Sequence, residues 1–174
     1  IMIVTAFAAL ISSGGAPRAS ICMGKQDNKS AEQILGNCFS LQIAVSIVLT
    51  VVLLIWNKDL LMAFGASKNT LGYATDYMRI YALGTLFVQL TLGMNAFITA
   101  QGFTTISMVS VLIGAICNIT LDPVFIFVFN MGVKGAALAT VLSQAISTMW
   151  VVVFLSGKKT QLHLQKKYMD LKPK

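Results

Sequence analysis

The sequence predicts an all-α integral membrane protein, and three observations support this fold class. Hydrophobic residues make up 56% of the chain and charged residues only 11%, whereas soluble proteins carry roughly 25% charged residues. The mean hydropathy is +0.78. Several long apolar runs each supply the ~20 residues that a helix needs to cross about 30 Å of hydrocarbon. The composition therefore indicates a multi-pass integral membrane protein, and we expect it in the plasma membrane.

Five membrane spans are expected in order along the chain. The first begins with the apolar run Ile1–Ile11 and continues past Pro17. A signal peptide would carry basic residues before its apolar run, and none precede this one. We therefore expect the sequence to be a piece of a longer coding region. The expected spans are residues 1–23, 37–56, 79–101, 105–129 and 135–156.

The longest connection lies between the second and third spans. Its first part, Asn57–Phe64, predicts a short helix at the membrane interface, and Ser67–Tyr77 predicts a second amphipathic segment leading into the next span. Tight turns are expected at Gln101–Gly102 and Asn130–Gly132. Residues 157–174 form a basic tail after the last span.

Basic residues predict the orientation of the spans, because Lys and Arg accumulate on the cytoplasmic side of short loops. Five spans place nine basic residues on one side: Arg18, Lys25, Lys29, Lys158, Lys159, Lys166, Lys167, Lys172 and Lys174. Four fall on the other side: Lys58, Lys68, Arg79 and Lys134. The N-terminal end is therefore expected outside and the tail in the cytoplasm. This placement accounts for the net charge of +7 without a nucleic-acid partner.

Asp122 is the candidate functional residue, because it is the only charged residue between Arg79 and Lys134. A charge inside an apolar span costs roughly 2.5–3.5 kcal/mol on insertion scales, so such residues usually face a bundle interior, a cavity or an ion path. Asn118 lies one helical turn earlier on the same face. Pro123 removes a backbone donor and predicts a kink.

Polar residues form stripes on three neighbouring spans, at a spacing of three or four residues. Helix packing by small residues explains many of them. A cation or proton site is the second interpretation, because oxygen ligands suit a hard cation such as Na⁺. The residues expected to face such a site or cavity besides Asp122 are Tyr77, Tyr81, Thr91, Asn95, Asn118, Thr140 and Gln144.

The cysteines and the histidine do not suggest another chemistry. Cys22, Cys38 and Cys117 have neither metal-ligand nor disulfide spacing. His163 is a lone residue in the basic tail and predicts a solvated side chain. We expect no cofactor and no bound metal beyond a possible Na⁺ at Asp122.

Six segments resemble the multidrug and toxic compound extrusion (MATE) family. They are Gly14–Ser20 with Gly24-Lys-Gln-Asp27, Tyr81-Ala-Leu-Gly-Thr85 with Asn95–Gly102, Asn118-Ile-Thr-Leu-Asp122-Pro-Val-Phe-Ile-Phe127, and Gly132–Gln144. The sequence Leu121-Asp122-Pro123 within the fifth of these segments resembles the DinF-like and related bacterial or archaeal branches of the family. The resemblance implies five helices, the second to sixth, of a six-helix lobe in a twelve-helix, two-lobe transporter. Residues 1–156 would form this partial N-terminal lobe, and residues 157–174 the start of the inter-lobe linker.

The resemblance also implies roles for individual residues. Asn118, Asp122, Thr140 and Tyr77 match positions of the cation or proton network of the first lobe, and Asn95 matches a residue that lines the lobe cavity. The family's first helix, whose acidic residue completes this network in many members, is not in the sequence, and neither is the second lobe.

The resemblance implies a secondary antiporter, not an enzyme, that exports organic cations or amphipathic drugs in exchange for Na⁺ or H⁺. Its partners would be small organic molecules, the lipid bilayer and the missing second lobe. One alternative is a lipid-linked oligosaccharide flippase of the same superfamily, which would need a more cationic cavity. Another is a non-transporting membrane scaffold or a degenerate gene fragment.

Overall fold

The computed structural model describes residues 2–165 and residue 167, and in this part of the chain every regular element is helical. The predicted all-α fold class is confirmed. Ile1 and, within the basic tail, residue 166 and residues 168–174 lie outside the described residues. The elements are α1 (Met2–Gly24), α2 (Asn28–Ile55), α3 (Asn57–Ala63), α4 (Leu71–Leu83), α5 (Thr85–Ala100), α6 (Thr104–Pro123), the π-helical turn η1 (Val124–Val128) and α7 (Val133–Ser156).

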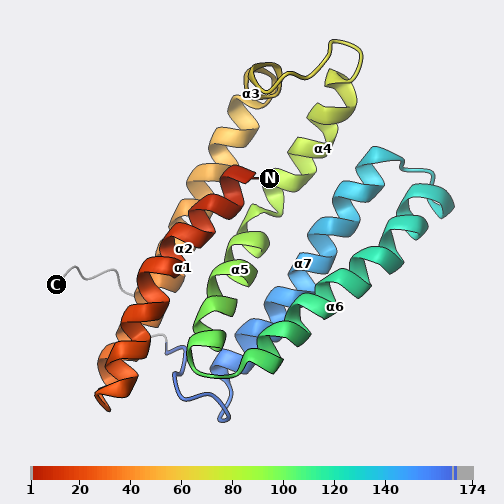
Figure 1. Ribbon diagram of the computed structural model, residues 1–174. Helices are drawn as coiled ribbons and strands as arrows, with labels where there is room; N and C mark the ends of the chain where they lie inside the picture. The colour runs from red at the N-terminus through yellow and green to blue at the C-terminus, as the bar shows by residue number, and fades with distance from the viewer. Residues whose placement is uncertain (1, 166, 168–174) are drawn as a thin grey trace.

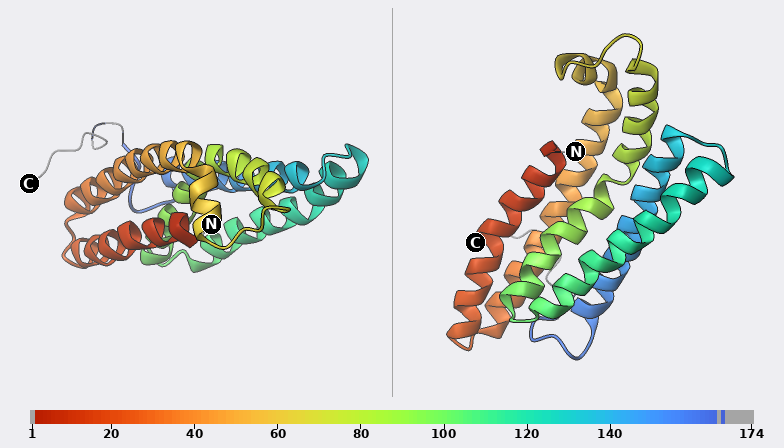
Figure 2. Two further views of the ribbon diagram at one scale, coloured as in Figure 1. Left: turned by 90° about the horizontal axis from the view of Figure 1, so that it is seen from above. Right: turned by 45° about the vertical axis from the view of Figure 1, so that its right-hand side comes forward.

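The helices form an elongated bundle of two layers (Figures 1 and 2). Viewed from above, α2, α4 and α7 lie in one layer and α1, α5 and α6 in the other. Helix α5 also packs diagonally against α2 and α7. We call the end that carries α3 the loop end and the opposite end, where α7 finishes, the tail end (Figure 1).

Three helices are individually long and apolar enough to cross a membrane: α2, α6 continued through η1, and α7. Helices α4 and α5 meet this description only as a pair, and they are bent by 55° at Gly84. Helix α1 has 23 residues but contains Arg18, Pro17 and two adjacent glycines, which lower its hydropathy. The five predicted crossings remain predictions.

Two predicted spans differ from the helices that form. The span expected at 79–101 is divided by the break at Gly84: its start belongs to α4, which begins at Leu71 within the segment expected as a separate amphipathic approach, and the rest forms α5. The span expected at 37–56 starts nine residues earlier, at Asn28. Ala31 and Leu35 are fully buried in this added part of α2, so packing extends the helix beyond the apolar run. The short helix expected after the second span is confirmed as α3.

The turn between α1 and α2 is stabilised by a helix cap. Asp27 precedes α2, and its Oδ1 accepts a hydrogen bond from the Ser30 backbone N–H at 3.1 Å. Hydrogen bonding from the side chain and the backbone of Ser30 lowers the pKa of the Asp27 carboxyl. The cap satisfies one of the free N–H groups at the start of α2.

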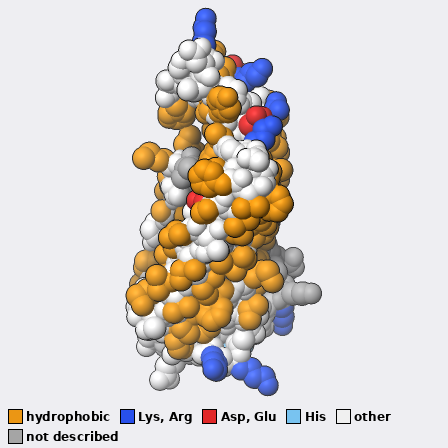
Figure 3. Space-filling model, turned by 90° about the vertical axis from the view of Figure 1, so that its right-hand side faces the viewer, with side chains coloured by type: hydrophobic (Ala, Val, Ile, Leu, Met, Phe, Trp, Pro, Cys, Tyr) orange, Lys and Arg blue, Asp and Glu red, His pale blue; other side chains and the backbone are white. Residues whose placement is uncertain are grey.

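The core has two parts, one in each half of the bundle. The larger part lies toward the tail end and centres on α5, with Met94, Phe97 and Ile98 fully buried against α1, α2 and α7. The smaller part includes Val4 and Tyr81. On the face shown in Figure 3, apolar side chains cover the middle of the molecule and Lys and Arg side chains lie toward its two ends. This distribution fits a bundle that is surrounded by hydrocarbon.

Candidate functional site

Asp122 lies in the last turn of α6, where the helix changes its geometry. Pro123 follows directly and has no N–H to donate to the carbonyl of Ile119. The next five residues form the π-helical turn η1, in which the Phe129 N–H donates to the Val124 carbonyl at 3.1 Å. Single π-helical turns often occur at functional sites. A π-helical turn therefore follows Pro123, and the kink predicted there stays a prediction.

The structure brings three predicted residues together across α6 and α7. The Asn118 Nδ2 donates to Asp122 Oδ1 at 3.5 Å and to Thr140 Oγ1 at 3.4 Å. Thr140 in turn donates to the Ala136 carbonyl at 3.0 Å. All three side chains that face each other here are half-buried. Both bonds from Asn118 are long and therefore weak, so the amide, the carboxylate and the hydroxyl form a loosely held polar group.

Tyr77 and Tyr81 lie next to each other on α4, apart from the Asp122 group. Their rings stack on α4 with centroids 6.1 Å apart and planes 12° from parallel. They line an open cavity of about 390 Å³ at the loop end, together with residues of α3, α4 and the start of α7. The lining of this cavity does not include Asp122, and no hydrogen bond among the described residues joins either tyrosine to it. The expected place of Tyr77 in the Asp122 network stays a prediction.

The remaining predicted residues form a second polar layer nearer the tail end. Asn95 on α5 accepts a hydrogen bond from Ser110 Oγ of α6 at 2.7 Å. The hydroxyls of Thr91 and Thr148 are 2.7 Å apart, so one donates to the other, and both lie within hydrogen-bond distance of the backbone carbonyl of Gln144 on α7. This layer joins α5, α6 and α7. Two of its atoms, Asn95 Nδ2 and Gln144 Oε1, are buried with no hydrogen-bond partner among the described residues.

Sequence reasoning missed two buried glutamines. Gln42 on α2 and Gln89 on α5 are both fully buried. The Gln89 amide donates to the Val4 carbonyl at 3.0 Å, whereas neither polar atom of Gln42 has a partner among the described residues. Gln42 lies directly against Gly93, one turn after Gln89 on α5. A long amide in an apolar span was a detectable signal, but these two do not fall on the stripes of small polar residues.

No group of three or more His, Cys, Asp or Glu side chains suited to a metal ion occurs among the residues described. The Asp122 group instead offers one carboxylate and the hydroxyl oxygen of Thr140, and Asn118 turns its amide nitrogen toward both of them. Neutral oxygens and one carboxylate are suitable ligands for a hard monovalent cation. The same carboxylate could carry a proton instead.

Comparison with known proteins relates the whole fold to one family. The sequence profile of the MatE family matches residues 1–124. The chain is 30% identical over 166 residues to the multidrug export protein MepA of Staphylococcus haemolyticus. The aligned residues cover 95% of this chain and 37% of that protein. It is 28% identical over 145 residues to MepA of Staphylococcus aureus, covering 83% of this chain and 32% of that protein.

Solved structures agree with this relation. A MATE transporter crystallised in a bent conformation superposes with a TM-score of 0.91 at 25% identity, over 99% of this chain and 38% of that one. An inward-facing MATE transporter superposes with a TM-score of 0.90 at 23% identity, over 97% of this chain and 39% of that one, and shares the fold. The chain thus spans well under half the length of the relatives that it matches. By its matched profile and its relatives, this chain belongs to the MATE family.

Proposed function

We propose that this chain is the greater part of one lobe of a secondary multidrug antiporter, which exports organic cations or amphipathic drugs in exchange for Na⁺ or H⁺. Membership of the MATE family and relatives named as multidrug export proteins support export. The observation that carries the coupling part of the proposal is the half-buried Asp122, which contacts Asn118 within α6, a helix that has no other charged residue.

The geometry around Asp122 suits reversible binding of a small cation. A charged carboxylate away from water is stable only with a positive or hydrogen-bonding partner. Asn118 supplies only one long hydrogen bond to Asp122. In this proposal, the binding of a cation or proton neutralises the charge of the carboxylate. Because the same amide also reaches Thr140 on α7, neutralising Asp122 would alter a contact between two helices. Ion binding would in this way change how α6 packs against α7.

A second lobe and the lipid bilayer would cover the exposed apolar surface of this chain. Helix α6 is the least covered of the apolar helices, because only Ser110 and Gly114 of its residues are buried. Its exposed apolar side chains include Val111, Ile116 and Ile119. An apolar face of this extent marks contact with lipid or with another protein surface. We propose that Tyr81, Thr91, Asn95 and Gln144 line a substrate cavity within this lobe.

Substituting Asp122 in the full-length protein tests the proposal. Asp122→Asn keeps the shape and removes the charge, so we expect it to abolish cation-coupled efflux while the protein still reaches the plasma membrane. Asp59→Asn is the matched control, since Asp59 is an exposed carboxylate in α3. The measurement is exchange of a fluorescent organic cation in membrane vesicles, driven by an imposed Na⁺ or H⁺ gradient.

The same assay identifies the coupling ion and can reject the proposal. Only one of the two gradients should drive exchange. Wild-type rates in the Asp122→Asn protein would show that Asp122 merely packs. An absence of any organic-cation exchange by the wild-type protein would favour the alternative of a flippase. Cysteine labelling from each side of the membrane tests our further proposal that the tail end faces the cytoplasm.

A further inference from the structure

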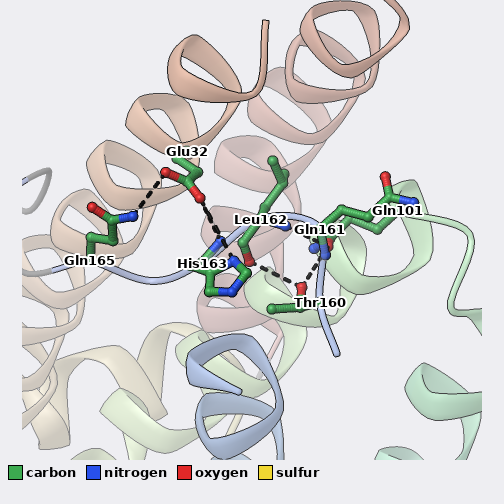
Figure 4. A network of polar contacts seen from close by, with 7 residues as sticks. All are labelled: Glu32, Gln101, Thr160, Gln161, Leu162, His163 and Gln165. Carbon is green, nitrogen blue, oxygen red and sulfur yellow. Dashed lines mark hydrogen bonds and ion pairs between the residues drawn. The ribbon is translucent and has the colours of Figure 1, made fainter. Parts of the chain in front are cut away.

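The chain that leaves α7 does not depart from the bundle but folds back across its tail end. Helix α7 ends at Ser156, and Gly157 takes an extended conformation. Residues 160–165 then run past the end of α5 and the first turns of α2 (Figure 4). We call residues 160–165 the strap.

Gln101, the residue that caps α5, holds the first half of the strap. Its side-chain oxygen accepts hydrogen bonds from Thr160 Oγ1 at 2.6 Å and from the backbone N–H groups of Gln161 and Leu162, each at 3.0 Å. Gln101 and Thr160 are both buried. The Gln101 side chain therefore accepts hydrogen bonds from three donors of a segment about 60 residues away. These three hydrogen bonds fix the path of the strap.

Leu162 inserts between the helices at the centre of the strap. It is fully buried and belongs to the same apolar core as Leu35 of α2 and Phe97 of α5. The next backbone contact returns to α7, where the Leu164 N–H donates to the Leu155 carbonyl at 3.0 Å. A non-helical segment seldom buries a leucine completely, because its backbone polar groups must be satisfied as well. Here Gln101, Glu32 and Leu155 accept hydrogen bonds from the backbone N–H groups of residues 161–164.

Glu32, in the second turn of α2, holds the second half. Its two carboxylate oxygens divide the contacts: Oε1 accepts from the His163 backbone N–H at 3.1 Å, and Oε2 accepts from Gln165 Nε2 at 3.2 Å. The His163 ring Nδ1 also lies 3.7 Å from Oε1. The Glu32 side chain is only 14% exposed. The backbone of His163 is thus held by Glu32 (Figure 4), while its side chain, expected to be solvated, is 40% exposed.

We propose that the strap ties the tail ends of α2, α5 and α7 into one unit, so that force on the chain beyond α7 reaches the whole lobe. Without these contacts, a pull on that chain would reach α5 only through its packing against α7, and α2 only through α5 or α4. The mechanical part of this inference rests on the proposed function, because an antiporter built of two lobes must move them relative to each other. Glu32 and Gln101 are then positioning residues that transmit this movement.

Limited proteolysis tests the strap without any transport measurement. Lys158 and Lys159 are exposed directly before the strap, and trypsin needs the surrounding chain to open before it can cut there. We expect Gln101→Leu and Glu32→Leu to speed cleavage at these lysines about tenfold or more in the purified full-length protein, since several hydrogen bonds are lost at once. Gln33→Leu is the matched control, because Gln33 is exposed on the same turn of α2. Mass spectrometry identifies the cut.

Thr160→Val serves as a milder variant that keeps the side-chain shape, and it decides the matter if a leucine variant does not fold. We expect it to speed cleavage about fivefold, since it removes one buried hydrogen bond. Unchanged cleavage in the folded variants would overturn the strap. Faster cleavage with wild-type exchange of organic cations would overturn its role in transmitting movement. If the wild-type protein shows no exchange, the proposed function fails, and cleavage still decides whether the strap exists.

Discussion

Gly135 offers a sharp test of how closely α7 packs against the π-helical turn that follows Asp122. It lies in the first turn of α7 and faces the backbone of Phe125. A Cβ atom at this position would lie 2.7 Å from the Phe125 carbonyl oxygen and 2.8 Å from its carbonyl carbon, whereas ordinary contact begins at 3.4 Å. The shortfall is about 0.7 Å, and it involves backbone that cannot rotate away as a side chain end can.

The expected change in the free energy of unfolding of Gly135→Ala follows from two opposing effects. Alanine is a better helix former than glycine, and at an unstrained site the exchange stabilises a protein by about 0.4–1 kcal/mol. Overpacking of a close contact typically costs about 1–3 kcal/mol. For Gly135→Ala the second effect should dominate, because α7 and η1 must separate. Since Thr140 follows little more than one turn later on α7, this separation would also disturb its contact with Asn118.

Gly72→Ala is the matched control. Gly72 also lies in the first turn of a helix, α4, but a Cβ atom there would meet nothing within 4 Å. Thermal unfolding of the purified variants should show Gly72→Ala as stable as the wild type or more so. Gly135→Ala should unfold several degrees lower, since 1 kcal/mol corresponds to about 2–4 °C for a chain of this size. If Gly135→Ala is as stable as Gly72→Ala, the packing argument is refuted.

Two further predictions concern the buried glutamine and the helix cap. A Cβ atom on Gly93 would overlap the amide of the fully buried Gln42, so Gly93→Ala should destabilise the protein by about 1–3 kcal/mol. The same exchange should cost less in a Gln42→Ala background, and equal costs in a double-mutant unfolding cycle would contradict this contact. Because Ser30 lowers the pKa of Asp27 below its ordinary value of 3.8, the cap stabilises the fold above pH 3.8 and loses this effect as the pH falls through the lowered value. The unfolding temperature of Asp27→Asn should therefore fall less between pH 5 and pH 3 than that of the wild type, and parallel curves would argue against the cap.

Much of the candidate site could be predicted from residue spacing. Asn118 and Asp122 are four residues apart on one helix, so their contact follows from helical geometry alone. Thr140 could be expected nearby because the turn at Asn130–Gly132 makes α6 and α7 antiparallel neighbours. Spacing could not tell whether the tyrosines of α4 reach the same group, because the 55° bend at Gly84 sets their direction. That bend coincides with close packing of Val141 on Gly84.

The amino-acid sequence by itself determined the fold class, the approximate helices and the isolated carboxylate, because apolar runs, helical spacing and charge are local properties of the chain. The tertiary structure alone decided which polar groups meet across helices, as with Gln42 against Gly93 and the Thr91–Thr148 pair. It also decided that the basic tail begins as a strap with a buried Leu162. These contacts join residues tens of positions apart, and their geometry depends on how the helices pack together.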